Sequence, residues 1–491
     1  MAPTEHPATR GPFALLLAAA TAVLIAALFS PALADDREFR AGAAASNITP
    51  PLGLPVIGGW APFPATHVHD ELWARCLVLD DGSTRLAIVV ADNLGLPREV
   101  CEAARGWIEA ETEIPGSHVL IAATHTHSAA SARTDTRLVA AESLGDYQHF
   151  IARRIADGVR CAVNNLEPAR IAFGSAELAD EVFNRRWFME EGDHLRNPFG
   201  GMDRVRMNPP RGSEALIEPA GPTDPEIAFI SLQSAEGRPL ALLANYSLHY
   251  VGGVPGGHIS ADYFGVFADR IQELLEADRL DPPFVGILSN GTSGDINNIN
   301  FRESGRSYPP YGKMREVADR AARAVLAAHE EAAFHDWVPL AAAMDDLPLA
   351  TRKPSEEKVA YMRAVLEKPE GEPAYHARER NYAERILRQL EAPDEVSVPL
   401  QALRIGPAGI AAIPFEVFVE IGLEIKERSP LPQAFTISFG NGSYAYLPTP
   451  RHHELGGYET WLGSSLVEPE ASTKIVERLL AMLADLEAEG P

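Results

Sequence analysis

Two histidines set two residues apart, His125 and His127, follow the apolar run Val119 to Ala123. Alternate residues of an extended segment point to one face, so both imidazoles can reach the same point in space. Ligands collect at the ends of sheet strands, and imidazole is a common ligand of zinc. The pattern favours a divalent metal site with zinc as the first candidate, while a polar strand end with two solvated histidines accounts for it equally well.

Further polar residues stand where other apolar runs end. They are Asp92, His249, Asp295 and Glu416, with a tyrosine-containing loop after Phe439. Two imidazoles and a carboxylate form the ligand set of a catalytic zinc, which keeps one position for water. Zinc lowers the pKa of that water to about 7 and polarises a carbonyl oxygen, so hydrolysis needs no nucleophilic side chain.

Three motifs of other enzyme classes are missing from the sequence. It contains no Gly-x-Ser-x-Gly elbow, no phosphate loop and no dinucleotide fingerprint. These absences disfavour serine hydrolases, kinases and dehydrogenases.

Apolar periodicity predicts strands that alternate with helices. Short turns between apolar runs predict hairpins over 72–91, 227–245 and 400–413. Helical spacing predicts helices over 97–112, 145–166, 262–276, 314–332, 416–428 and 466–489. The second of these helices should turn Phe150 toward the core. The charged stretch 355–390 predicts a helical pair, and the Gly- and Pro-rich stretch 180–225 predicts an ordered lid or wall. We therefore expect an α/β fold, with mixed β-sheets flanked by helices in a single large catalytic domain.

Composition indicates a large globular protein. The 491 residues are 46% hydrophobic and carry a net charge of -25, which argues against nucleic-acid binding and against docking on anionic lipid by charge. Three cysteines, Cys76, Cys101 and Cys161, lie in apolar-periodic segments, where a buried free cysteine is the ordinary expectation.

The N-terminus has the form of a secretion signal. Arg10 precedes the apolar run Phe13 to Phe29, and Ala32-Leu33-Ala34 has the small-x-small form of a cleavage site. We expect a signal peptide over residues 1–34 and a secreted or periplasmic domain over 35–491, with an uncleaved membrane anchor as the less favoured alternative.

The chain resembles the catalytic N-terminal domain of the neutral, non-lysosomal ceramidases over nearly all of its length after the signal. The most specific matches are Thr124-His-Thr-His-Ser128 and the pair Tyr446 and Tyr458, twelve residues apart. Weaker matches follow in the family's order: Asn47-Ile-Thr-Pro50, Ala91-Asp-Asn-Leu-Gly95, Asn184-Arg185, His249, Ser260 to Gly265, Asn290 to Asn297 and Pro414-Phe-Glu416.

The resemblance implies a metal centre and its neighbours. The implied zinc ligands are His125, His249, Glu416 and Tyr446. His127 and Tyr458 would lie beside the metal and hydrogen-bond the substrate carbonyl or the developing oxyanion. Arg185 would line the pocket, and His127 or Glu416 would move the proton.

Other acidic residues and histidines receive lesser roles. Asp92 and Asp262 would either orient a ligand or cap a helix, and we expect Asp262 to be a helix cap. Five histidines are expected to be plain loop residues: His67, His69, His258, His452 and His453.

The chain also departs from the family's pattern. Asn297 stands where the ceramidases have Ser, Phe415 replaces the Gly of Pro-Gly-Glu, and Trp187 to Pro222 has no clear counterpart. The family's C-terminal β-domain is expected to be missing. The metal centre is thus retained, whereas the parts that fit ceramide differ.

The resulting prediction is an exported zinc-dependent amidohydrolase. Its substrate would be an N-acylsphingosine or a related N-acyl compound, and membrane contact would occur only through that substrate. The alternatives are hydrolysis of a non-lipid amide or ester on the same metal centre, and a non-catalytic binding homologue.

Overall fold

The runs rich in Val, Ile, Leu and Ala form a nine-stranded sheet, because such side chains pack well on a buried pleated surface. Its strands lie in the order β16-β14-β13-β8-β1-β5-β6-β7, and β18 pairs with β8. The pairs β6–β7 and β14–β16 are parallel, and the other pairs are antiparallel. The strands are β1 (Arg40–Asn47), β5 (Trp73–Asp80), β6 (Arg85–Ala91), β7 (Val119–Ala123), β8 (Glu167–Glu177), β13 (Glu226–Ser234), β14 (Pro239–Tyr246), β16 (Val285–Asn290) and β18 (Phe334–His335).

The computed structural model describes Met1 and residues 37–59, 61–132, 137–139, 141, 143–369 and 371–488. The predicted signal peptide over residues 1–34 lies outside the described residues, apart from Met1. From Phe39 onward the chain forms one compact unit, which agrees with the predicted single large domain.

A second sheet of four strands packs face to face on the first. Its order is β19-β20-β21-β23, and only the pair β21–β23 is parallel. One hydrophobic core joins the two sheets, with Leu77 and Ile230 from the first sheet and Leu403, Ile410 and Phe435 from the second. The strands are β19 (Leu340–Ala350), β20 (Glu395–Ile405), β21 (Ala408–Ile413) and β23 (Gln433–Ser438).

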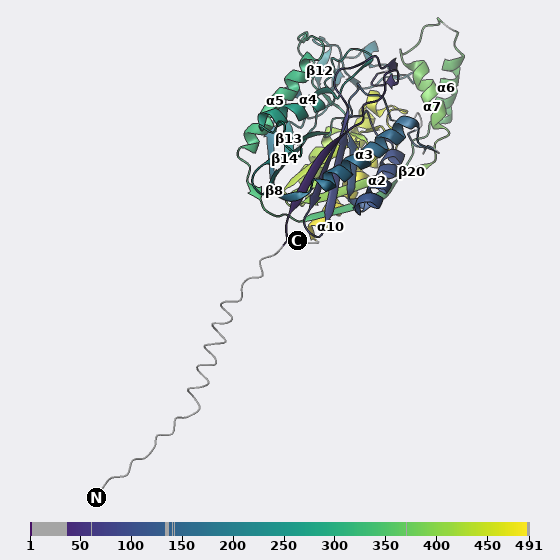
Figure 1. Ribbon diagram of the computed structural model, residues 1–491. Coiled ribbons are helices and arrows are strands. Elements are labelled where there is room, and N and C mark those ends of the chain that lie inside the picture. The colour runs from purple at the N-terminus through teal and green to yellow at the C-terminus, as the bar shows by residue number, and fades with distance from the viewer. Residues whose placement is uncertain are drawn as a thin grey trace. The chain divides into compact units, whose positions relative to one another are not determined.

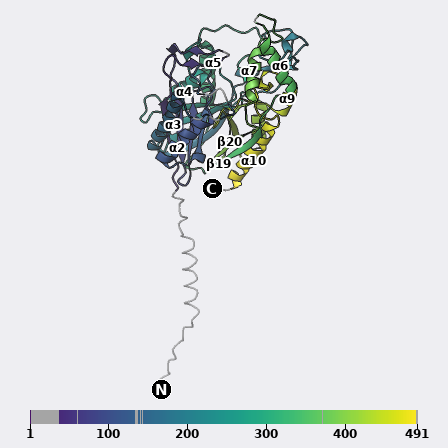
Figure 2. The ribbon, with the colours of Figure 1, turned by 90° about the vertical axis from the view of Figure 1, so that its right-hand side faces the viewer.

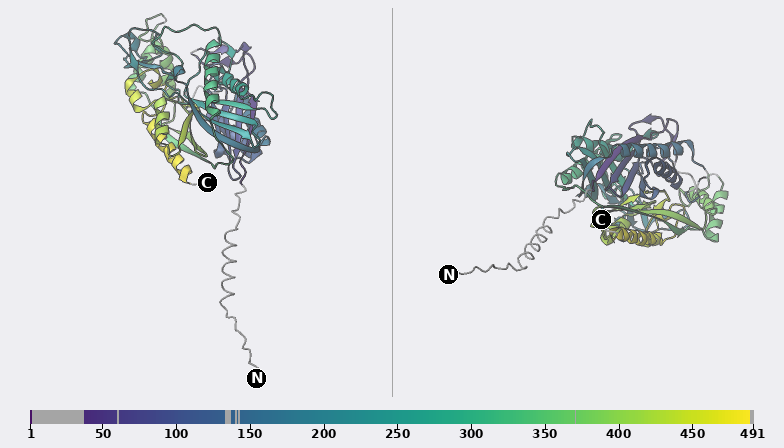
Figure 3. Two further views of the ribbon diagram at one scale, coloured as in Figure 1. Left: turned by 90° about the vertical axis from the view of Figure 1, so that its left-hand side faces the viewer. Right: turned by 60° about the horizontal axis from the view of Figure 1, so that its bottom comes forward.

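Helices cover both outer faces, which produces a helix–sheet–sheet–helix arrangement (Figure 1, Figure 3). Helices α2 and α3 pack on one half of the large sheet, and α4 and α5 pack on the other half. Helices α8 and α10 cover the small sheet. The prediction of mixed sheets flanked by helices is confirmed. The helices are α2 (Arg98–Thr112), α3 (Asp146–Asn164), α4 (Asp262–Leu274), α5 (Gly312–His329), α8 (Val419–Arg428) and α10 (Ala471–Ala488).

The predicted charged helical pair is also confirmed. It consists of α6 (Glu356–Glu367) and α7 (Glu379–Gln389), which pack together over Leu462. Figure 2 shows α6 and α7 on the same side of the molecule as α9 (Pro450–Leu455) and α10.

The stretch 180–225 is more regular than the sequence predicts. It contains β9 (Phe183–Asn184), and its strands β10 (Arg186–Met189), β11 (Val205–Met207) and β12 (Leu216–Pro219) form a three-stranded sheet. Trp187 is buried there among apolar side chains. The Gly and Pro residues mark the turns between short strands, so this segment forms a structured wall.

Three local predictions are wrong. Phe150 is 39% exposed, because it lies at the rim of the apolar face of α3 that Ile151 and Ile155 fill. Cys161 is exposed, while Cys76 and Cys101 are buried. The helix predicted from Glu416 begins only at Val419.

No helix in the part of the chain that the structure describes is both long enough and apolar enough to span a membrane.

Asn441 joins the two sheets behind the strand ends. Its backbone N–H donates to the Ile121 carbonyl over 2.7 Å. Its side-chain oxygen accepts from the Ile121 N–H over 3.1 Å and from the Arg105 guanidinium, and its amide donates to Gln401 over 2.8 Å. Its φ of 66° is a conformation that Asn tolerates better than most residues. One fully buried amide therefore ties β7 to β20 and to the end of β23.

We predict that Asn441→Ala lowers the free energy of unfolding by about 3 kcal/mol, because it leaves buried polar partners unsatisfied. Urea unfolding measures the change. Asn164→Ala, at an exposed position of α3, is the control and should stay close to wild type. Equal stability of the two variants would contradict this role of Asn441.

Candidate metal centre

The carboxyl ends of strands from both sheets meet at one edge of the molecule. His125 follows β7, His249 follows β14, and Glu416 follows β21 in the short strand β22 (Glu416–Val417). The Asn290 amide at the end of β16 donates to the Thr124 carbonyl over 3.2 Å, which brings the two edge strands of the large sheet together there. Residues far apart in the sequence therefore converge on one point.

Three histidines form a cluster at this edge. The ligand atoms of His125, His127 and His249 lie within 4.8 Å of one another, and the Nε2 atoms of His125 and His127 are 3.1 Å apart. His125 and His127 approach each other as predicted, but the predicted reason for this is wrong. His125 has a φ of 68°, so a left-handed residue after the strand brings the rings together, not alternation along an extended strand.

Neighbouring groups orient each imidazole. Nδ1 of His125 lies 2.6 Å from the Leu94 carbonyl. A carbonyl only accepts, so Nδ1 carries the hydrogen and Nε2 presents its lone pair to the cluster. The His125 ring stacks on Phe439 at 4.2 Å, and the His127 ring stacks on Tyr250 at 3.7 Å.

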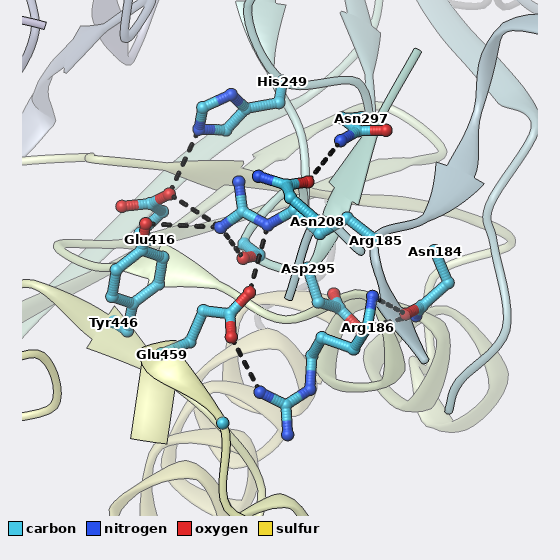
Figure 4. Close-up of polar contacts among 12 residues, drawn as sticks. Asn184, Arg185, Arg186, Asn208, His249, Asp295, Asn297, Glu416, Tyr446 and Glu459 are labelled. Atoms are coloured by element: carbon cyan, nitrogen blue, oxygen red, sulfur yellow. Dashed lines mark hydrogen bonds and ion pairs between the residues drawn. The ribbon is translucent and has the colours of Figure 1, made fainter. Parts of the chain in front are cut away.

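The Glu416 carboxylate completes the cluster. Its Oε1 lies 3.1 Å from Nε2 of His249 (Figure 4). The same oxygen lies 3.6 Å from Nε2 of His125. Burial alone would raise the pKa of the Glu416 carboxyl. The combined effect of His125 and His249 is opposite and larger, so this pKa lies well below its ordinary value. Burial lowers the pKa of His249 to about 3, with a smaller contribution from Arg185. Burial therefore favours a neutral His249 beside an ionised Glu416.

Tyr446 is placed beside Glu416 by strand pairing. Strand β22 runs parallel to β24 (Tyr446–Leu447), and Glu416 stands opposite Tyr446 in the register. The Tyr446 hydroxyl accepts from Nη2 of Arg185 over 3.2 Å, and the same nitrogen lies 3.5 Å from Oε1 of Glu416. Burial and the Glu416 charge raise the pKa of Tyr446 well above its ordinary value. The ring of Tyr458 lies edge-on to Tyr446 at 5.8 Å.

The donor spacing fits a tetrahedral metal ion. Donors bound to one zinc at about 2.0–2.2 Å stand roughly 3.3 Å apart. The separations of 3.1 and 3.6 Å from Glu416 to His249 and His125 agree with that spacing. The 3.1 Å separation of His125 and His127 agrees as well, so His127 is close enough to compete for a ligand position. Imidazole and carboxylate donors suit zinc by their chemistry.

Asp262 has a different role from the predicted helix cap. The cap of α4 is Ala261, and Asp262 is the first residue of the helix. Its carboxylate accepts from the backbone N–H groups of Val251 and Gly252 over 3.0 and 2.8 Å. It also accepts the Tyr263 N–H over 2.7 Å. Asp262 therefore holds the loop that directly follows His249 against the start of α4.

Asp92 binds away from the cluster. Its carboxylate accepts from Arg75 over 2.5 Å and from the Trp73 N–H over 2.9 Å. The link to the cluster is indirect, because the next residue, Asn93, accepts the His125 N–H through its carbonyl over 2.9 Å.

Four of the histidines expected to be plain loop residues lie in strands or in a helix. His67 and His258 pair in the short strands β4 (His67–Val68) and β15 (His258–Ile259), and their rings are 4.8 Å apart. His452 lies in α9 and is buried, with its Nδ1 2.7 Å from the Thr449 hydroxyl. His453 lies in the same helix. The loop expectation is therefore wrong for these four residues.

Sequence reasoning missed two charged residues of the site. Glu459 accepts from both Arg185 and Arg186, and all three side chains are buried. The position of Glu459 directly after Tyr458 and the Arg185-Arg186 pair were the available signals, but only the fold brings the two segments together.

We predict that Asp262→Asn weakens Zn²⁺ binding by about tenfold, because one acceptor oxygen is replaced by a donor facing the loop after His249. Asn keeps the left-handed backbone that Asp262 adopts, with φ 58°. Competition with a chromogenic chelator measures the affinity. Asp269→Asn, on the same helix, should bind Zn²⁺ as wild type does, and equal affinity in both variants would count against this role of Asp262.

Comparison with known proteins identifies the family. A protein-family model described as "Neutral/alkaline non-lysosomal ceramidase, N-terminal" matches residues 39–304. The fold is similar to that of a neutral ceramidase from Pseudomonas aeruginosa, with 19% identity, a TM-score of 0.66, and coverage of 93% of this chain and 76% of that chain. A ceramidase complexed with C2 is similar with 18% identity, a TM-score of 0.67 and the same coverage. The chain belongs to the neutral/alkaline non-lysosomal ceramidase family.

Proposed function

We propose that this protein is a zinc-dependent hydrolase that cleaves the amide bond of an N-acylsphingosine or a related N-acyl lipid. Family membership supports a ceramidase-like amide hydrolase. The observation that carries the proposal is the convergence of His125 and His249 on Glu416, because each imidazole nitrogen lies at a zinc-ligand separation from the same carboxylate oxygen.

The proposed ligands are His125, His249, Glu416 and Tyr446. As zinc ligands, His125 and His249 would present the lone pairs of neutral imidazoles, and the low pKa of Glu416 keeps its carboxylate ionised. Bound zinc would lower the pKa of a water ligand to about 7, polarise the amide carbonyl and favour the ionised phenol of Tyr446.

The remaining site residues act on the substrate and on protons. His127 stands beside the proposed ligands with its ring fixed against Tyr250, so its Nε2 can hydrogen-bond the amide carbonyl or the developing oxyanion. Tyr458 is proposed to donate to the same oxygen from the opposite wall. Transfer of a proton to the leaving nitrogen is assigned to His127 or Glu416. Arg185 supports this arrangement by its contacts with Tyr446 and Glu416.

A non-lipid amide or ester is the second candidate for the substrate. Asn297 stands where the ceramidases have Ser, and its amide donates to Asn208 over 2.8 Å within the wall. This difference favours a substrate that departs from ceramide in the part that contacts the wall.

We further propose that residues 1–34 are a cleaved secretion signal, so that the enzyme acts in the periplasm or outside the cell. Ala32-Leu33-Ala34 supports this assignment. N-terminal sequencing of the protein after export in a bacterial host should give Asp35 as the first residue. Recovery of the uncleaved chain in the membrane fraction would instead support an anchor.

We predict about one zinc per chain by elemental analysis, and loss of both zinc and hydrolysis of a fluorogenic N-acyl lipid in His249→Ala. His127→Ala should keep the metal and lose activity by at least about 100-fold, because it removes a donor to the oxyanion. Removal of zinc by a chelator should abolish activity, and added Zn²⁺ should restore it.

His329→Ala is the matched control, because His329 contacts Ser231 on β13 and not the cluster. It should retain zinc and activity. Loss of zinc in His127→Ala would make His127 a ligand. Zinc without lipid hydrolysis would favour the second candidate, and wild-type protein without zinc would contradict the metal mechanism.

A further inference from the structure

We propose that Glu459 is a positioning residue, which holds the Arg185 guanidinium against Tyr446 and Glu416. This inference rests on the proposed function, because it assigns Glu459 a task in that reaction. Glu459 contacts none of the proposed ligands directly and would act only through Arg185.

Two consecutive arginines converge on this one carboxylate (Figure 4). Nε of Arg185 donates to Oε1 of Glu459 over 3.1 Å, and Nη1 of Arg186 donates to Oε2 over 2.8 Å. The side chains of Arg186 and Glu459 are fully buried, and that of Arg185 is 5% exposed. Each carboxylate oxygen therefore has its own guanidinium, which fixes the rotation of Glu459.

Arg186 is itself anchored on the side away from the site. Its Nη2 donates to the Gly456 carbonyl over 2.5 Å, and its guanidinium lies 5.3 Å from the centre of the Phe418 ring. It therefore holds Glu459 in place while Glu459 holds Arg185.

The backbone of Arg185 is held at both ends. Its N–H donates to the Asp295 carbonyl over 2.8 Å, and its carbonyl accepts from the Asn208 N–H over 2.8 Å. Only the side chain of Arg185 can then change its orientation. Glu459 restrains it by accepting a hydrogen bond from Nε.

The bond from Nε to Glu459 directs the other end of the planar guanidinium. Nη2 donates to the Gly294 carbonyl over 2.6 Å and to the Tyr446 hydroxyl over 3.2 Å, and it lies 3.5 Å from Glu416. A guanidinium is rigid, so fixing Nε on Glu459 fixes where Nη2 points.

Charge balance requires the carboxylate at this position. Two buried guanidiniums on adjacent residues repel each other, and a negative charge between them offsets this repulsion. The negative charge of Glu459 offsets the positive charge of Arg186. The negative charge of Glu416 then offsets the positive charge of Arg185. Without the charge of Glu459, Arg185 and Arg186 lose their shared partner, and Arg185 is expected to leave Tyr446.

The test replaces Glu459 by Gln, which keeps the size and removes the charge. Glu459→Gln should lower kcat by about 10- to 100-fold, with KM within twofold and zinc content unchanged. Glu459→Asp, which restores the charge, should recover part of the lost kcat.

Glu181→Gln is the matched control. Glu181 is also a buried carboxylate between two cations, Lys313 and Arg320 of α5. Its replacement should lower the free energy of unfolding and leave kcat unchanged. An equal loss of kcat in the two variants would contradict the positioning role and show that Glu459 is only structural.

A crystal structure of Glu459→Gln gives a readout that does not depend on activity. Arg185 should move beyond hydrogen-bond distance of the Tyr446 hydroxyl. An unmoved Arg185 would overturn the inference, as would an unchanged kcat. Wild-type protein that lacks zinc or hydrolysis would reject the proposed function alone, and the position of Arg185 would still decide the role of Glu459.

Discussion

The Glu416 carboxylate is the negative charge around which the buried site is arranged. A carboxylate removed from water is costly unless opposite charges and hydrogen-bond donors surround it. Here His249 and His125 approach one of its oxygens from the large sheet, and Arg185 approaches the same oxygen from the wall. Each partner comes from a different segment, so the carboxylate is compensated only when the whole fold is assembled.

The two packed sheets provide the geometry for this convergence. Parallel pairs at both ends of the large sheet and within the small sheet direct the carboxyl ends of β7, β14 and β21 to one edge. The bond from Asn290 to the Thr124 carbonyl and the contacts of Asn441 close that edge from behind. Buried amides thus fix the position of one sheet relative to the other. A shift between the sheets would leave these amides without hydrogen-bond partners, which costs free energy.

The site has two sides that different parts of the chain form. The histidine cluster, Glu416 and Tyr446 form the first side. The wall of β10, β11 and β12 and the pair α6 and α7 surround the opposite side, where Tyr458 reaches α7 through Trp461. Under the proposed function, the first side carries the chemistry and the second side would contact the rest of the substrate.

Much of this protein is determined locally by its sequence. Apolar periodicity predicted the hairpins and helices, since strand and helix differ in the spacing of their buried residues. The motif Thr124 to Ser128 pointed to the histidine cluster. The strand end at Glu416 and the tyrosine motif likewise pointed to residues that the structure places beside that cluster.

Only the tertiary structure decided how these residues meet. His125 reaches His127 through a left-handed backbone that no alternation pattern predicts. Asp262 turns from a helix cap into a support for the loop after His249, because the two segments pack together only in the fold. The hydrogen bonds from Arg185 and Arg186 to Glu459 join residues more than 270 positions apart in the sequence. Local spacing carries no information about such pairs, because the desolvation and charge compensation that select them exist only in the assembled interior.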